Sequence, residues 1–511
     1  MSVLKPARPA QARAGSRLLF CGLLAVILSA CGGGGGGGSD VSPPPPPPPP
    51  PVTDPAGIDK ALLRQQVDAF VAEQKARIET IDCSQSQTGP CEPIRNIRFS
   101  DGQAQPAKLR SDQTVLLIDY GPFFSAMLRY RSRMLAYYRV NESTGLVEPH
   151  DPVIAQAPRW GVELLRAIDG FQYRDGAGQQ RPSFVPADWL RPLAPLVGAR
   201  SFVGPEWSGF HGAAVLSMVV EASPQAGFVL LDPFPFEAVL KANRSSACAK
   251  DWAALEQGVQ RTAQSLQAVL QRHGVDYVNM SGGVDAQNLR MWDGLGCGSA
   301  LSSDEARALM LAYRPLYAAL FESPTVLGVQ AAGQHMAPHN APLDMLALPH
   351  RVRAQSFNAR ATRLSADGIT GAQRPAVHEP WAHDRAWVDV FLNTGLLSDD
   401  VPLQINERPP LKTDNHFGLR LGPSGDYVNP SFIAPQALNR LIHLKQQLAP
   451  TMAPEAPLDA ALIQRMKDAL TPLGCSWAPE DGGRCKLQDP AWHRQQELFR
   501  QGWLPADWRW E

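Results

Sequence analysis

Three polar residues that lie far apart in the chain stand where elements of secondary structure are predicted to begin or end. Asp119 follows a short apolar run, His211 precedes a helical stretch of small residues, and Ser431 heads another helical stretch. A carboxylate, an imidazole and a hydroxyl can take part in acid–base and nucleophilic catalysis. Each residue also has an ordinary structural explanation. Asp119 could be a turn former or a metal ligand, His211 a core histidine, and Ser431 a helix N-cap.

Two other segments have the composition of a binding site. Ser281-Gly282-Gly283 ends an apolar strand, and a strand edge of small residues can accept an extended peptide as an added strand. Gln334 follows another apolar strand that ends on glycine, and its amide N–H₂ could donate a hydrogen bond to a developing oxyanion. Neither segment is specific by itself.

The elements that must position these residues alternate along the chain. Apolar strands are predicted at residues 114–118, 227–231, 275–280 and 325–331, and helices at residues 58–81, 212–221, 252–272 and 303–321. The last of these helices has a serine cap, and Pro315 should kink it. The alternation predicts an α/β fold with a parallel sheet covered by helices on both faces. Such sheets bind ligands at the carboxyl ends of their strands, which places Asp119, Ser281 and Gln334 near one edge.

In this order the five segments resemble the motifs of the subtilisin-like serine peptidases, the subtilases. The matching stretches are Asp119-Tyr120-Gly121, similar to Asp-(Thr/Ser)-Gly; His211-Gly212-Ala213-Ala214-Val215, similar to His-Gly-Thr-His-Val; Val275 to Gly283, similar to Val-Asp-Val-Ile-Asn-Met-Ser-Leu-Gly; Ala331-Ala332-Gly333-Gln334, similar to Ala-Ala-Gly-Asn; and Asn429 to Pro435, similar to Gly-Thr-Ser-Phe-Ala-Ala-Pro. The order aspartate, histidine, serine is that of subtilisin. The resemblance extends from about Thr114 to about Leu448.

The resemblance implies a serine endopeptidase with a subtilisin-like fold that carries insertions. In such an enzyme Ser431 would attack a peptide carbonyl, His211 would accept the serine proton, and Asp119 would orient the imidazole. The Ser431 N–H and the Gln334 side chain would form the oxyanion hole, and the Ser281–Gly283 segment would bind the peptide. We therefore expect a protein or peptide substrate and no cofactor. Structural calcium is frequent in this family, but the sequence assigns no ligands to it.

Several positions depart from the family's pattern. Gln334 stands where the family usually has asparagine, Asn429-Pro430 replaces Gly-Thr, and Ala213-Ala214 lacks the polarity of Thr-His. The long stretch between Asp119 and His211 must hold an insertion, which could cover the cleft. These departures leave an alternative open, in which a catalytically weak or inactive subtilase-like protein acts as a binding or assembly module of the cell envelope.

Two other types of hydrolase fit the sequence less well. An α/β-hydrolase esterase needs Gly-x-Ser-x-Gly after a strand, and Gly422-Pro423-Ser424-Gly425-Asp426 fails at its last position. A zinc peptidase needs His-Glu-x-x-His on a helix. His335 and His339 have this spacing without the glutamate, and Pro338 between them would disrupt the helix. We therefore predict no metal site.

The first thirty residues predict a targeting segment. Basic residues precede the apolar run Leu18 to Ala30, which is too short to span a hydrocarbon core of roughly 30 Å. Leu28-Ser29-Ala30-Cys31 resembles a lipobox, which implies cleavage before Cys31 and lipidation of its thiol. An ordinary signal peptide with an incidental cysteine is the alternative. Glycines 32–38 and prolines 43–51 would then form a flexible joint and a semi-rigid spacer.

These features predict a protein of the cell envelope that is bound to a membrane through a lipid. Gly32 after the cysteine favours the outer membrane, with the folded domain in the periplasm or on the cell surface. The formal net charge is −1 and no run of basic residues occurs, which argues against a nucleic acid as partner.

Six cysteines follow Cys31, and an even number in an exported chain favours disulfides. Pairing between neighbours in the sequence would give Cys83–Cys91, Cys248–Cys297 and Cys475–Cys485. We predict five parts along the chain: a signal peptide at residues 1–30, a lipidated Gly/Pro-rich linker at 31–54, a helical lead-in at 55–110, a peptidase domain at 111–449, and a C-terminal extension packed on that domain at 450–511.

Overall fold

The computed structural model describes residues 59–109, 113–121, 127–199, 210–285, 289–298, 300–332, 340–357, 388–393, 411–414, 417–421, 430–449, 457–470 and 487–488. Several of the features predicted from the sequence lie outside these ranges. They are the signal segment and linker with Cys31, the proposed oxyanion residue Gln334, the pair His335 and His339, and the pair Cys475 and Cys485.

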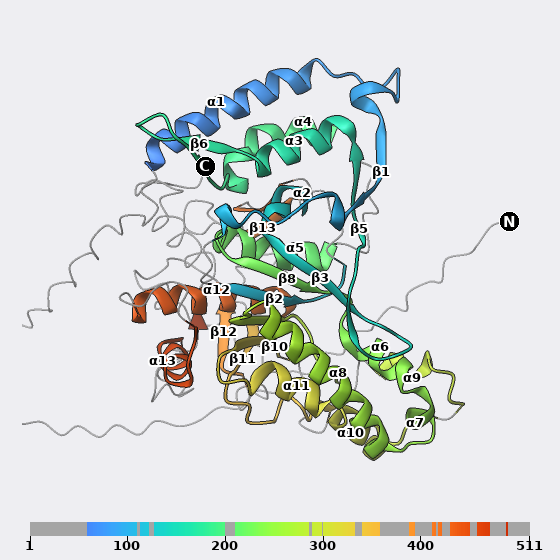
Figure 1. The fold of residues 1–511 in the computed structure, drawn as a ribbon. Helices are drawn as coiled ribbons and strands as arrows, with labels where there is room; N and C mark the ends of the chain where they lie inside the picture. The colour runs from blue at the N-terminus through green and yellow to red at the C-terminus, as the bar shows by residue number, and fades with distance from the viewer. Residues whose placement is uncertain are drawn as a thin grey trace, which may run out of the picture. The chain divides into compact units, whose positions relative to one another are not determined.

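Nine of the described strands form one sheet (Figure 1). Its order is β15 (Leu487–Gln488), β12 (Val390–Asn393), β11 (Arg351–Phe357), β10 (Leu327–Ala331), β9 (Tyr277–Met280), β2 (Thr114–Ile118), β8 (Gly227–Leu231), β3 (Met134–Val140) and β4 (Val147–Pro149). All neighbouring strands run parallel except β3 and β4. The predicted parallel α/β sheet is therefore confirmed. Strands β2 and β8 have the predicted bounds, and β9 and β10 each begin two residues later.

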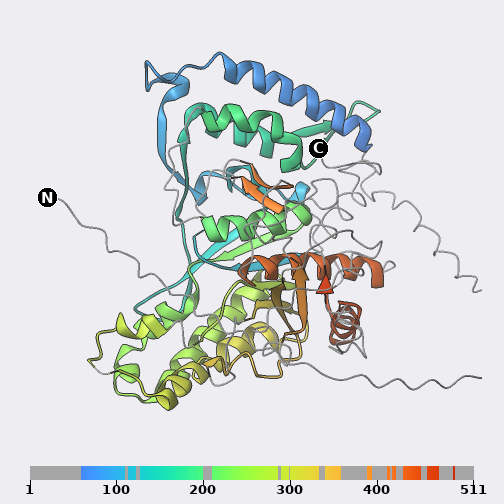
Figure 2. The same cartoon turned by 180° about the vertical axis from the view of Figure 1, so that it is seen from behind.

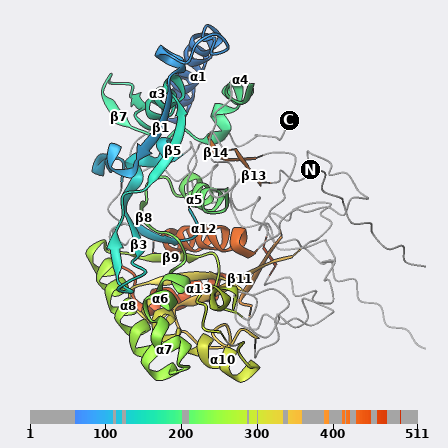
Figure 3. The ribbon, with the colours of Figure 1, turned by 90° about the vertical axis from the view of Figure 1, so that its right-hand side faces the viewer.

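Helices cover both faces of this sheet, as predicted (Figure 3). One face is covered by α5 (Phe210–Ala222) and α12 (Pro430–Leu448), and α13 (Ala460–Leu470) packs against α12. The other face is covered by α6 (Pro235–Ala242), α8 (Trp252–Arg272), α10 (Ser303–Leu311) and α11 (Arg314–Phe321), with the short helices α7 (Arg244–Cys248) and α9 (Arg290–Asp293) beside them. Figure 2 shows the same layers from behind.

Strand β2 shows why the sequence forms two cores. Val115 and Leu117 pack into the core beneath α5 and α12, whereas Leu116 and Ile118 pack into the core beneath α8 and α11. Successive side chains of a strand point to opposite faces, so a strand covered on both faces must be apolar throughout. The unbroken apolar run in the sequence therefore reflects a strand at the centre of the sheet.

One predicted helix is two helices. The prediction placed a single kinked helix at residues 303–321, but α10 ends at Leu311 and α11 starts at Arg314. Ser302 is the N-cap of α10 and forms a capping box with Glu305. Pro315 stands in the first turn of α11, where its missing N–H removes no helical hydrogen bond. The proline therefore starts a new helix instead of kinking a continuous one.

The described part of the insertion between β2 and α5 extends the sheet and packs against the N-terminal segment. It supplies β3 and β4 to the sheet edge, and its other elements are α2 (Met127–Tyr130), β5 (Val153–Pro158), α3 (Arg159–Asp169), the hairpin β6 (Gln172–Arg174) with β7 (Gln180–Pro182), and α4 (Ala194–Ala199). The segment predicted as a helical lead-in contains α1 (Lys60–Glu79) and also β1 (Pro93–Arg98), which pairs antiparallel with β5.

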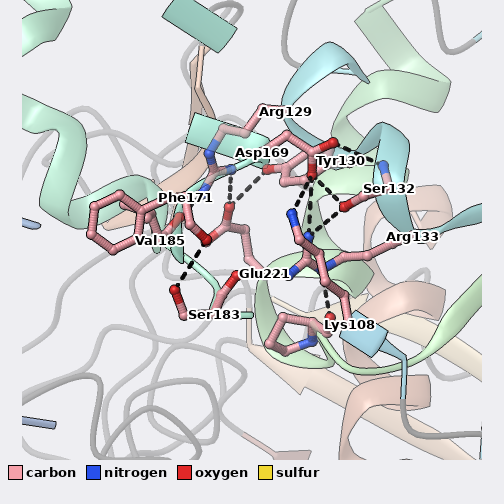
Figure 4. Close-up of polar contacts among 11 residues, drawn as sticks. Lys108, Arg129, Tyr130, Ser132, Arg133, Asp169, Phe171, Ser183, Val185 and Glu221 are labelled. Atoms are coloured by element: carbon pink, nitrogen blue, oxygen red, sulfur yellow. Dashed lines mark hydrogen bonds and ion pairs between the residues drawn. The ribbon is translucent and has the colours of Figure 1, made fainter. Parts of the chain in front are cut away.

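A buried polar network joins this insertion to α5 (Figure 4). The Glu221 carboxylate, at the end of α5, accepts hydrogen bonds from the Arg129 guanidinium and from the Tyr130 hydroxyl. Its other oxygen accepts the Ala187 N–H at 3.0 Å. Arg129 also donates to the Phe417 carbonyl at 2.7 Å, beside the hairpin of β13 (Leu411–Asp414) and β14 (Gly418–Leu421). Three segments that are distant in the sequence therefore meet at one ion pair.

Two of the three predicted disulfides are confirmed. Cys83 and Cys91 are bonded with a Cα–Cα distance of 5.3 Å, and Cys248 and Cys297 with a Cα–Cα distance of 5.1 Å. The third pair, Cys475 and Cys485, stays a prediction because both residues lie outside the described ranges. Among the helices of the described ranges, none combines the length and the hydropathy needed to cross a membrane.

Candidate active site

Asp119 lies at the carboxyl end of β2, where its carboxylate is buried and directed toward His211. Asp119 Oδ1 is 2.5 Å from His211 Nδ1 and also accepts the Tyr120 N–H at 2.6 Å. The Asp119 N–H donates to the Leu231 carbonyl of the neighbouring strand β8 at 3.3 Å. The side chain is 7% exposed. The strand pairing therefore fixes the backbone of this aspartate, and a second backbone donor helps to orient its carboxylate.

His211 reaches Asp119 because the first turn of α5 approaches the turn after β2 very closely. The Gly212 N–H donates to the Tyr120 carbonyl at 3.1 Å. A Cβ built on Gly212 would lie 2.3 Å from that carbonyl oxygen, which is shorter than any tolerable contact. The histidine is thus brought to the aspartate by a glycine that permits backbone-to-backbone packing. The His211 side chain remains 30% exposed.

The start of α12 lies beside the His211 ring. Ser431 is the second residue of this helix and is 9% exposed, and Pro430 occupies the first helical position, where proline is well tolerated. The ring of Phe432, the residue after the serine, lies 4.9 Å from the His211 ring between centroids. Farther along, Asn439 Nδ2 donates to the Met218 carbonyl of α5 at 2.9 Å. The two helices that carry His211 and Ser431 therefore pack side by side, with their first turns together.

The segment predicted to bind peptide continues from β9 at the same edge of the sheet. Ile118 of β2 pairs with Met280 of β9, so the chain after each strand emerges at the same level. Ser281 is buried, and its hydroxyl accepts the Asn279 Nδ2 hydrogen at 2.7 Å, so this side chain fixes the strand end. The backbone that follows is closely packed. A Cβ on Gly282 would lie 3.0 Å from the Phe234 ring, and one on Gly283 would lie 2.9 Å from the Tyr317 hydroxyl.

Asp232 is a residue of this site that the sequence prediction missed. It follows β8 as Asp119 follows β2, and its Oδ1 accepts the Gly121 N–H at 2.5 Å. Its Oδ2 accepts the hydroxyl of Tyr137, from the inserted strand β3. Burial raises the pKa of the Asp232 carboxyl above its ordinary value, an effect opposed by these two hydrogen bonds. The only signal in the sequence was an aspartate after a second apolar strand.

The structure brings some of the predicted site residues together and does not describe others. Asp119 and His211 are in direct contact, and Ser431 lies on the helix turn that packs against His211. Gln334 lies outside the described residues, so the second oxyanion donor stays a prediction. Within the described ranges, no group of three or more histidine, cysteine or carboxylate side chains is placed to hold a metal ion.

No model of a protein family matches the chain, and no curated protein matches it. It is similar to the solved structure of a lanthipeptide protease, with a TM-score of 0.36 and 12% identity over 87% of this chain and 97% of that one. It is also similar to the patellamide maturation protease PatA, with a TM-score of 0.29 and 13% identity over 76% of this chain and 97% of that one. A further likeness is to a structure of the subtilase cytotoxin SubAB, with a TM-score of 0.31 and 9% identity over 78% of this chain and 95% of that one. These values are low, so they establish neither membership of a family nor an activity.

Proposed function

We propose that this protein is a subtilisin-like serine endopeptidase that hydrolyses peptide bonds with Asp119, His211 and Ser431. The observation that carries the proposal is the 2.5 Å contact between Asp119 Oδ1 and His211 Nδ1, in a place where the first turn of α12 packs against the same imidazole. A histidine oriented by a buried carboxylate, beside the helix turn that carries a serine, fits the arrangement that nucleophilic acyl transfer needs.

The proposed chemistry follows from these contacts. In the proposed mechanism Asp119 accepts a hydrogen bond from His211 Nδ1–H, and Nε2 would accept the proton of Ser431. The serine oxygen would attack the peptide carbonyl, and His211 would then pass the proton to the leaving amine. Water would release the acyl group in a second cycle of the same proton transfers.

Charge on the tetrahedral intermediate would be stabilised by the start of α12. The backbone N–H groups of a helix's first turn lie at the positive end of its dipole. The Ser431 N–H belongs to this turn, and we propose the Gln334 side chain as the second donor. The peptide would lie along the backbone of the Ser281–Gly283 segment, which continues from β9 at the same edge of the sheet.

Active-site labelling with a fluorophosphonate tests this proposal without knowledge of the natural substrate. We expect stoichiometric labelling of the purified chain at Ser431, identified by peptide mapping, and none in Ser431→Ala. His211→Ala should slow labelling by at least about 100-fold, because the serine loses its general base. Ser143→Ala, which removes an exposed hydroxyl, is the matched control and should label normally.

Absence of labelling in a folded wild-type chain would contradict catalysis and leave the alternative of a binding or assembly module of the cell envelope. In that case Ser431→Ala and His211→Ala should leave any partner binding unchanged.

We also propose that the chain is anchored to a membrane through a lipid on Cys31. The basic start, the short apolar run and the lipobox-like sequence support this proposal. Cys31→Ser should release the protein from washed membranes or block processing of the precursor. Complete retention of that variant in membranes after a high-salt wash would contradict it.

A further inference from the structure

The turn that carries Asp119 is held by a second carboxylate on the next strand. Asp232 accepts the Gly121 N–H with one oxygen and the Tyr137 hydroxyl with the other. Its own N–H donates to the Tyr138 carbonyl of β3 at 3.1 Å. Asp232 is therefore fixed to β3 by both backbone and side chain, and it fixes the Asp119 turn in its place.

A continuous series of hydrogen bonds and peptide bonds leads from Tyr137 to the proposed catalytic histidine. Gly121 is bonded to Tyr120, whose carbonyl accepts the Gly212 N–H at 3.1 Å. Gly212 is the residue after His211. The Tyr120 N–H also holds Asp119 Oδ1 at 2.6 Å, which is the oxygen that faces the imidazole. A shift of this turn would therefore displace both partners of the Asp119–His211 contact.

Tyr137 itself is held by its ring, independently of its hydroxyl. The ring is 2% exposed and makes edge contacts with Phe99, at 5.7 Å between centroids, and with His150, at 5.9 Å. Burial raises the pKa of the Tyr137 hydroxyl well above its ordinary value, so the group stays protonated and remains a donor. Removal of the hydroxyl alone should leave the ring in place and delete one hydrogen bond.

We propose that Tyr137 and Asp232 are positioning residues for the catalytic centre, and that the inserted strand β3 thereby sets the geometry of the Asp119–His211 contact. This inference rests on the proposed peptidase function. Neither residue is proposed to touch the substrate. Both act through the turn at Tyr120 and Gly121, so the insertion would serve the chemistry through β3, a strand of the same sheet.

Tyr137→Phe and Tyr138→Phe form a matched pair for the test. The two tyrosines are adjacent on β3 but face opposite cores, and the Tyr138 hydroxyl contacts His273 Nε2 at 2.8 Å. We expect Tyr137→Phe to lower the maximal rate of fluorophosphonate labelling by about 10–100-fold with an unchanged binding constant for the reagent, since small misplacements of catalytic groups have effects of this size. Tyr138→Phe should leave both constants unchanged.

Two further readouts distinguish positioning from loss of stability. The His211 Nδ1 proton, held by Asp119, should give a downfield proton resonance that broadens or shifts in Tyr137→Phe and persists in Tyr138→Phe. Asp232→Asn should slow labelling as well, and the double variant should be no slower than the slower single variant, because both residues act through one path.

The outcomes separate failure of the inference from failure of the proposed function. An unlabelled wild-type chain would reject the proposed function. A labelled wild type in which Tyr137→Phe keeps its labelling rate and its downfield resonance would overturn the positioning role. Multiplicative effects of the two single variants would overturn it too, because they would indicate separate roles.

Discussion

The nitrogen of Gly212 lies 3.1 Å from the carbonyl oxygen of Tyr120, and a Cβ at this glycine would lie 2.3 Å from the same oxygen. At the scale of single residues, this contact decides whether His211 can reach Asp119. Gly212 belongs to the motif that begins at His211 in the sequence, and the structure gives the physical reason why a glycine is needed at this position. The adjacent Ala213 is buried and small, which is consistent with the same close packing.

Gly212→Ala should separate the two backbones and lengthen the Asp119–His211 contact. We expect labelling of Ser431 to slow by about 100-fold and the free energy of unfolding to fall by about 1–3 kcal/mol from overpacking. Gly176→Ala is the control, because a Cβ there meets no atom within 4 Å. Labelling kinetics and urea denaturation measure the two effects, and normal labelling by folded Gly212→Ala would contradict this account of the site.

A second single-residue prediction concerns pH. Lys108 is buried, with its amine 3.7 Å from Asp169 Oδ1, and burial lowers the pKa of this lysine from 10.5 to about 8. Between about pH 8 and pH 10.5 the unfolded chain binds a proton at Lys108 that the folded chain does not, so stability should rise with pH in this window. Below pH 8 both states are protonated and the penalty of burying the charge is constant.

Lys108→Met should remove this rise and increase stability at pH 7 by no more than about 3 kcal/mol. Asp169 would keep its hydrogen bonds from Ser132 and Arg133. Urea denaturation of both proteins at pH 7 and pH 10 is the measurement. Equal pH dependence in the two proteins would show that Lys108 does not titrate in this window.

At the scale of elements, the Arg129–Glu221 ion pair holds the insertion, the end of α5 and the β13–β14 hairpin together. Both side chains are almost fully buried, at 1% and 0% exposed. Removal of one partner leaves the other charge buried and unpaired, which is costlier than the pair's own contribution. The network therefore determines how α5, and with it His211, is seated on the sheet.

Arg129→Met should lower the free energy of unfolding by about 3–5 kcal/mol, and Arg129→Met with Glu221→Leu should recover part of this loss. The control is Arg181→Met, which breaks the ion pair between Arg181 and Asp175. Because the Arg181 side chain is 46% exposed, this variant should lower the free energy of unfolding by less than about 1 kcal/mol. Chemical denaturation of the three variants tests the comparison. A loss below about 1 kcal/mol in Arg129→Met would mean that other contacts seat α5.

The elements most accurately predicted were those whose burial leaves an unambiguous pattern. Strand β2 is buried at every position and α8 has one apolar stripe, so the sequence marks their bounds directly. The break between α10 and α11 was missed because Pro315 can kink one helix or begin another, and only packing decides between these outcomes. The hydrogen bond between Asp232 and Tyr137 was missed because it requires β3 to lie beside β8. The local sequence pattern does not determine which strands are neighbours in the sheet.

At the scale of the whole molecule, the two confirmed disulfides close loops of very different length. Cys248 and Cys297 are 49 residues apart, whereas Cys83 and Cys91 are 8 apart. A cross-link restricts the unfolded chain more when the loop is longer. The Cys248–Cys297 bond should therefore be the larger contributor to stability.

Replacement of Cys248 and Cys297 by serine should lower the free energy of unfolding by about 2–5 kcal/mol, and the same change at Cys83 and Cys91 should have a smaller effect. Thermal and chemical denaturation of the two double variants, with peptide mapping of the remaining bond, gives the comparison. The reverse order of stability would show that strain or residual structure outweighs loop length.

The two edges of the sheet also differ in when they can form. Strand β3 and the short antiparallel β4 lie early in the chain, so the edge beside β8 can be completed while later parts are still being made. The opposite edge depends on β15, in which Leu487 pairs with Phe391 of β12. Among the described strands β15 covers this edge of β12, and without it the edge would be a template for strands of other molecules. Chains cut short before Leu487 should therefore be prone to association through the uncovered edge of Val390–Asn393.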